Sequence, residues 1–166
     1  MAGNIEYIIN RTAFELIAEE ILAYLDIDKI LGVLINDGLF AMWIYACEKM
    51  RLEKDVWRDI ERQGLEALER QKIVKFFCKI CQLTEGLEKE TVYENTLANL
   101  QRRFQEIQGR KMEEGRRKKE YEKAFYSELN QFFIDLAGDL PKLLFMRDLM
   151  EKVLLYARYH AKAVRV

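Results

Sequence analysis

The chain has 166 residues, of which 50% are apolar and 33% are charged, and its formal net charge is −1. This length predicts one helical domain over residues 1–166, large enough to bury a core without metal ions or disulfide bonds. One proline, eight glycines and three cysteines argue against a β-sheet fold and against a disulfide-stabilised secreted domain, and they favour a helical protein of the reducing cytoplasm.

Charge is unevenly distributed along the chain. Residues 1–50 contain three Lys/Arg and eight Asp/Glu, a balance of −5, whereas residues 101–166 contain fifteen and ten, a balance of +5. An acidic end and a basic end suit head-to-tail packing or contact of the basic end with an anionic polymer. The longest uncharged stretch, 38–47, is ten residues long, about half of what a membrane span needs. We therefore expect no membrane partner, and no secretory signal is recognisable at the N-terminus.

Apolar residues recur at helical spacing from the start of the chain. They predict a first helix over 4–25, followed by a turn at Asp26-Ile27-Asp28 that caps a short second helix. The strongest break signal in the chain is Asn36-Asp37-Gly38, which predicts a corner between helices with Asp37 as the N-cap of a third helix over 39–51.

The middle of the chain carries more charge but keeps the helical pattern. Residues 54–83 are predicted to be helical, with Gly64 as an interruption and Thr84-Glu85-Gly86 as the end, and a further helix begins near Glu88. Two glycines within the polar stretch 109–120 each cost roughly 1 kcal/mol in a helix, so this stretch is predicted to be flexible or to break the helix.

The C-terminal part predicts two more helices. One covers 116–137, and the last begins with Asp139 as N-cap and Pro141 in the first turn. The apolar side of the last helix is predicted to face inward through Met146, Met150, Val153, Leu154, Ala157, Ala161 and Val164. The expected fold is an all-α, compact bundle of about five to seven helices.

Catalytic and metal-binding motifs are scarce. His160 is the only histidine, so catalytic arrangements that need histidine must be built around it, and no phosphate-binding glycine loop or HExxH motif occurs. Cys78 and Cys81 form a C-x-x-C pair that could complete a zinc site with Cys47 and His160. Their apolar surroundings favour core packing instead. We expect no metal, no cofactor and no enzymatic activity; a cleft that gathered carboxylates around His160 would favour an enzyme.

Two helical faces are basic. At 100° per residue, the basic residues of the last helix fall within about 60° of one another, and those of the preceding helix share the face opposite Phe125 and Leu129. Such rows neutralise phosphates without reading sequence, although they can also be ordinary solvated faces. The candidate nucleic-acid-binding residues are Arg147, Arg158, Lys162 and Arg165 in the last helix, and Arg116, Lys119 and Lys123 in the preceding one.

Two segments resemble a known family. Residues 30–44 (ILGVLINDGLFAMWI) are similar to an apolar helix, a polar Asn-Gly-Leu corner and a second apolar helix in the small subunit of type III-B CRISPR effector complexes, the fifth Cmr subunit. Residues 154–163 (LLYARYHAKA) resemble the closing helix of that family. The corner here has Asp37 between the asparagine and the glycine. The small subunit of type III-A complexes is a related neighbour.

The resemblance implies a non-catalytic protein that stacks in several copies inside an RNA-guided interference complex. Its partners would be copies of itself, the other subunits, and the backbone of guide and target RNA. The resemblance carries over only Arg158 as a basic residue of the closing helix; the other basic candidates come from the helical-wheel argument. A helical adaptor or regulator that binds only proteins remains an alternative.

Overall fold

The computed structural model describes residues 2–88 and 91–164, with side chains at 4–84 and 91–164. These residues form nine helices and no strand, so the all-α prediction is confirmed. The helix count exceeds five to seven because the segment from 54 onward is divided into three. No helix among the described residues is long and apolar enough to cross a bilayer. The helices are α1 (Ala2–Ala18), α2 (Tyr24–Asp37), α3 (Leu39–Lys49), α4 (Val56–Gln63), α5 (Glu66–Glu69), α6 (Lys72–Glu88), α7 (Val92–Gln108), α8 (Glu114–Ala137) and α9 (Leu140–Val164).

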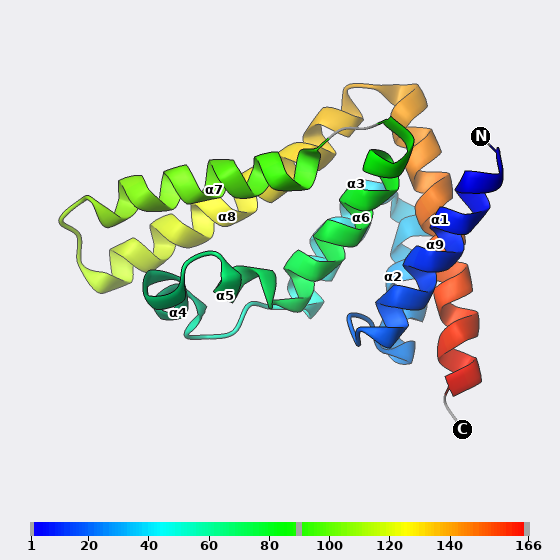
Figure 1. The fold of residues 1–166 in the computed structure, drawn as a ribbon, viewed down its shortest axis with the longest axis horizontal. Helices are drawn as coiled ribbons and strands as arrows, with labels where there is room; N and C mark the ends of the chain where they lie inside the picture. Colours follow the sequence, from blue (N-terminus) through cyan, green and yellow to red (C-terminus); the bar gives the residue numbers. More distant parts are fainter. Residues whose placement is uncertain (1, 89–90, 165–166) are drawn as a thin grey trace.

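The helices form two parts, which we call the body and the arm (Figure 1). The body consists of α1, α2, α3, α6 and α9, with α1 packed on α9 and α6, and α2 packed on α9 and α3. The arm is the α7–α8 hairpin, which extends away from the body, with α4 and α5 beside it.

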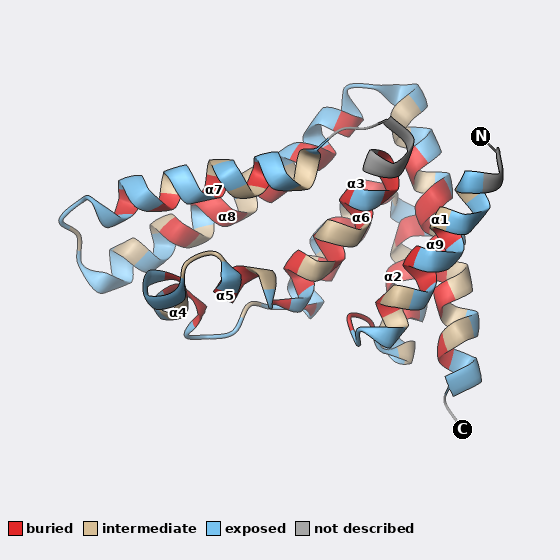
Figure 2. Cartoon of the chain, viewed as in Figure 1, coloured by how far each residue is buried: buried red, intermediate tan, exposed pale blue. Residues whose placement is uncertain are grey.

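Two aromatic clusters lie along α8; the first joins the arm to the body and the second lies within the arm. In the body, Trp43 stacks on Phe133 with ring centroids 4.8 Å apart, and its indole N–H donates to Asn130 Oδ1 at 2.7 Å. In the arm, Trp57 stacks on Tyr121 at 5.7 Å. Buried residues accordingly follow α8 along its length (Figure 2).

The prediction of one helix over 4–25 was wrong. Helix α1 ends at Ala18 and α2 begins at Tyr24, so the predicted turn at 26–28 lies inside α2. Glu20 adopts a φ of 56°, and the amides of Glu20 and Ile21 donate to the carbonyls of Ile17 and Leu16, each at 3.0 Å. This pattern is the Schellman motif, in which glycine usually occupies the left-handed position.

Two glycine corners were predicted correctly. Gly38 (φ 97°) separates α2 from α3, and Gly64 (φ 79°) ends α4. The assignment of Asp37 as N-cap was wrong, because Asp37 is the last residue of α2 and Gly38 holds the N-cap position.

The predicted end at Thr84-Glu85-Gly86 was also wrong, because α6 continues to Glu88. The Thr84 hydroxyl donates to the Cys81 carbonyl at 2.7 Å, a bond within the helix that lets a polar residue remain in it.

The second half of the chain follows the prediction more closely. The break within 109–120 is confined to 109–113, because α8 begins at Glu114. The amide of Lys142 donates to the Asp139 carboxylate at 3.3 Å, which confirms Asp139 as the N-cap of α9. Val164 was predicted to face inward, which was wrong. Residues 162–164 are exposed, because the end of α9 extends beyond the helices that bury its earlier turns.

Candidate nucleic-acid interface

The basic face of α8 lies on the outside of the arm. Arg116, Lys119 and Lys123 are exposed and fall within about 60° on the helix. Tyr121 and Phe125 occupy the buried side of the same helix. The apolar positions of α8 therefore orient the three cations toward solvent. Among the described residues, none of the three has an ion-pair partner.

The end of the arm is positively charged as a whole. Residues 102–123 contain nine Lys/Arg and five Asp/Glu, a balance of +4. Arg103 is bound to Glu128 at 3.0 Å and Arg117 to Glu61 at 3.3 Å. These pairs involve other positions of α7 and α8, so Arg116, Lys119 and Lys123 keep no ion-pair partner among the described residues, with Glu120 beside Arg116 on the same face.

The basic residues of α9 have a different environment. Arg147 donates to the Ile35 carbonyl at 2.8 Å, at the C-terminal end of α2, where carbonyl groups lack helical partners and a cation is favoured. Arg158 Nε lies 2.9 Å from Asp28 Oδ1, also on α2. Both arginines thus form polar contacts between α9 and α2. Lys162 is exposed, and Arg165 lies outside the described residues.

The four candidate zinc ligands come from three helices. Cys47 lies on α3, Cys78 and Cys81 lie on α6, and His160 on α9 packs edge-on against Phe14 with ring centroids 5.8 Å apart. Burial raises the pKa of the Cys47 thiol to about 12, which disfavours the thiolate that metals bind. Nowhere in the described parts of the chain do three His, Cys, Asp or Glu side chains gather in a way that could hold a metal ion.

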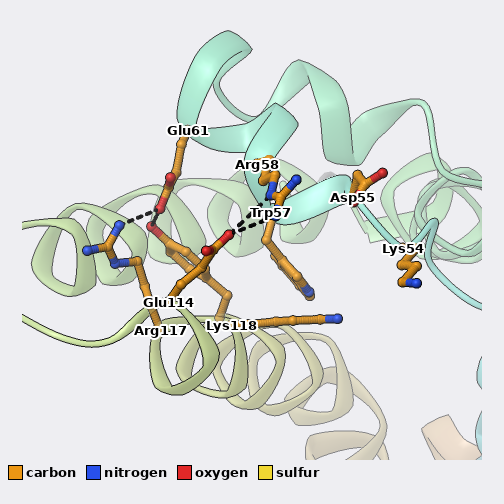
Figure 3. A pocket seen from close by; sticks show the side chains of 9 residues that line it. Lys54, Asp55, Trp57, Arg58, Glu61, Glu114, Arg117 and Lys118 are labelled. Atoms are coloured by element: carbon orange, nitrogen blue, oxygen red, sulfur yellow. Dashed lines mark hydrogen bonds and ion pairs between the residues drawn. The ribbon is translucent and has the colours of Figure 1, made fainter.

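A cleft between α4 and the start of α8 was not predicted. It has a volume of about 310 Å³, and Trp57 and Tyr121 are its aromatic lining residues. Figure 3 shows Trp57 among the charged side chains of the cleft. Two ion pairs cross it, Arg58 to Glu114 at 3.1 Å and Arg117 to Glu61 at 3.3 Å.

The Tyr121 hydroxyl donates to the same Glu61 carboxylate at 2.9 Å. Burial, reinforced by this hydrogen bond, raises the pKa of Tyr121 to about 12. Helical spacing carries no signal that Trp57 and Tyr121, which are 64 residues apart, meet in one cleft.

Comparison with protein-family models, with curated proteins and with solved structures finds no match to this chain. The resemblance to type III small subunits therefore rests on residues 30–44 and 154–163. Both segments lie in the body, where α9 packs against α2 and α3. The basic face of Arg116, Lys119 and Lys123 lies on the arm, outside both segments.

Proposed function

We propose that this chain is a non-catalytic RNA-binding subunit that contacts the nucleic-acid backbone through the outer face of α8. The observation that carries the proposal is the exposed row Arg116, Lys119 and Lys123, which has no ion-pair partner in the described structure and lies on an arm with a charge balance of +4. Cations that are free of intramolecular partners release counterions when they meet phosphates, and this favours binding to any sequence.

The resemblance to type III CRISPR small subunits supplies the biological setting of this proposal. In that setting the chain would act in the cytoplasm, stacked in several copies beside the other subunits and along guide and target RNA. A weak contact repeated along one strand gains affinity because the later contacts are made at high effective concentration. The overall charge of −1 suits such a shared contact better than tight binding by a single copy.

The experiment is a salt titration of binding to a single-stranded RNA long enough for several copies. The variant Arg116→Gln/Lys119→Gln/Lys123→Gln should weaken binding similarly for unrelated sequences. Its slope of log affinity against log salt should be shallower by about 2, since each phosphate contact on a single strand contributes about 0.7.

The matched control is Lys29→Gln/Lys72→Gln/Lys152→Gln, which removes the same charge from three exposed positions of α2, α6 and α9. Circular dichroism and melting temperature should be unchanged in both variants. Equal losses in the two variants, or an unchanged slope in the α8 variant, would contradict the proposal.

A second candidate is an adaptor that binds only proteins. Tyr7 and Phe14 on α1 and Tyr159 on α9 are exposed by 62%, 56% and 63%. Tyr7 and Phe14 are two helical turns apart and so share one side of α1. Exposed aromatic residues of this kind are typical of protein interfaces. If Tyr7→Ser/Phe14→Ser abolishes assembly with the neighbouring subunits while the α8 variant leaves RNA binding intact, the adaptor is the correct function.

A further inference from the structure

The cleft between α4 and α8 has surplus positive charge at its entrance. Its lining contains four cationic and three anionic side chains. Two of each are used in the ion pairs that cross it, Arg58 to Glu114 and Arg117 to Glu61. The ammonium groups of Lys54 and Lys118 have no ion-pair partner among the described residues, and both side chains are exposed.

The space around these two lysines is larger than an inorganic anion needs. A second cleft, of about 370 Å³, adjoins the first and shares Lys54, Trp57 and Lys118 with it; its own charged residues are Arg51, Glu48, Glu53 and Glu122, so the surplus positive charge belongs to the first cleft. Trp57 and Tyr121 are only 6% and 1% exposed, so they present the cleft with a narrow ring edge that packing holds in place. The occupant should therefore combine an anionic group with an apolar ring system.

The remaining polar groups favour a ligand that also donates hydrogen bonds. Asp55 and Glu61 both line the first cleft from the α4 side (Figure 3), and Glu61 is already paired with Arg117. Carboxylates accept hydrogen bonds from hydroxyl and amino groups, as ribose and nucleobases carry them, and would repel a ligand that offered anionic groups alone. We propose that this cleft binds a nucleoside phosphate, with the phosphate between Lys54 and Lys118 and the base over the edge of Trp57.

Glu114 should compete with a bound phosphate for Arg58, because these two side chains already form an ion pair. The two side chains are 63% and 75% exposed, and exposed ion pairs of this kind are weak and easily exchanged. An incoming phosphate replaces Glu114 as the partner of Arg58. Removing the carboxylate of Glu114 should therefore strengthen binding, whereas removing a merely structural contact would leave it unchanged.

The site is separate from the RNA-binding face in the proposed function. Lys118 and Lys119 are adjacent in sequence but project about 100° apart on α8, so Lys118 lines the cleft while Lys119 points to solvent. Lys119→Gln is therefore a matched control for Lys118→Gln, with the same change one residue along the same helix.

The experiment measures binding of adenosine 5′-monophosphate to the full chain by calorimetry and by intrinsic tryptophan fluorescence, to which Trp43 and Trp57 both contribute, with adenosine and inorganic phosphate as partial ligands. Lys54→Gln/Lys118→Gln should weaken binding about tenfold or more, because a hydrogen bond to a charged group is lost at each lysine. Glu114→Gln should tighten it about two- to fivefold, the strength of an exposed ion pair. Lys119→Gln should have no effect.

The outcomes are separable. Absence of saturable binding at millimolar nucleotide, or equal effects of Lys118→Gln and Lys119→Gln, would overturn the proposal. If Lys54→Gln/Lys118→Gln also weakens binding of a short single-stranded RNA, the nucleotide belongs to a strand; if only the mononucleotide is affected, the ligand is free. Because the outer-face variant is tested on RNA and the cleft variants on a mononucleotide, either proposal can fail while the other stands.

Discussion

The body and the arm are both built on a tryptophan stacked against α8, but they differ in what surrounds it. Trp43 is completely buried, and its indole N–H is bonded to Asn130. Trp57 stacks on Tyr121 in the same way, yet one side of it borders two clefts. The same aromatic arrangement is fully closed in the body, whereas in the arm Trp57 packs on α7 and α8 and keeps one edge beside the clefts.

The charged residues of the two parts differ in the same way. Arg147 and Arg158 in the body are bonded to α2, whereas Arg116, Lys119 and Lys123 on the arm point to solvent. A basic residue is available to a partner only where no neighbouring helix offers it a carbonyl or a carboxylate. Arg147 and Arg158 therefore stabilise the packing of α9 on α2, and the α8 row is the one where binding is expected.

The largest expected change is in the free energy of unfolding, and it should differ between variants of the two tryptophans. Trp43→Ala should lower the free energy of unfolding by about 3–5 kcal/mol, because it opens a closed cavity and leaves Asn130 without its partner. Trp57→Ala should cost at least about 1 kcal/mol less, since water can enter the vacated space from the cleft. Urea denaturation measures both, and equal losses would show that the arm cluster is as closed as the body cluster.

The two glycine corners should behave alike despite their different surroundings. Gly38→Ala and Gly64→Ala should each cost about 1–3 kcal/mol, because both glycines combine positive φ with extended ψ, a conformation almost confined to glycine. A Cβ at either position meets no atom within 4 Å, so the loss isolates backbone strain.

Gly32→Ala is the control for the corner variants. Gly32 lies inside α2, and its added Cβ would also be unobstructed. This change should be neutral or stabilising by up to about 1 kcal/mol. A corner variant that is as stable as Gly32→Ala would refute the strain argument.

An ion network between α1 and α6 makes the body sensitive to acid. Lys79 Nζ lies 2.5 Å from Glu15 and 2.8 Å from Glu19. Burial alone would raise the pKa of Glu15, but the hydrogen bonds from Lys79 and Arg11 outweigh it and lower the pKa below its ordinary value of 4.5. Stability from Glu15 is therefore present above that value and is lost as the pH falls through the folded-state pKa.

Glu15→Gln should cost about 1.5 kcal/mol at neutral pH, the lower end of the contribution of a hydrogen bond to a charged group. It should also flatten the acid limb of a stability–pH curve measured by thermal melting. The matched control is Glu6→Gln on the exposed side of α1, which should leave that limb unchanged.

The arm should instead be sensitive to alkali through Tyr121. Its pKa is raised from 10.0 to about 12, so the stability it contributes is complete below 10 and is lost as the pH rises toward the folded-state value. Tyr121→Phe should cost about 1 kcal/mol or less at neutral pH, because one hydrogen bond to Glu61 is removed. The loss of stability between pH 10 and 12 should be smaller in this variant, and ultraviolet titration of the phenols gives the ionisation directly.

The predictability of the fold depended on which residue marks each helix end. Gly38, Gly64 and Asp139 are standard signals for corners and caps, and helices end or begin beside them. Helix α1 ends just as sharply beside Glu20, but glutamate has no preference for positive φ. The apolar spacing continues across Glu20, so the sequence did not indicate this helix end. The opposite error occurred at Thr84, where turn-forming residues lie within a continuous helix.

The candidate site was predictable where one helix determines it. The outer face of α8 follows from the wheel alone, because its buried residues orient the cations outward. The α9 row did not behave as a free face, because a wheel contains no information on Asp28 and the Ile35 carbonyl, which a different helix supplies. The cleft required Trp57 and Tyr121 to meet, and only tertiary structure brings them together.

The pairing of α1 with α9 has a consequence for the order in which the chain can fold during synthesis. The arm hairpin joins neighbouring helices through the short segment 109–113, so it can form soon after α8 leaves the ribosome. The buried side of α1, which includes Ile9, Ala13 and Leu16, has its largest partner in α9, more than one hundred residues later. Until α9 emerges, the nascent body exposes an apolar helix face. Chaperones bind surfaces of this kind, and such surfaces promote aggregation.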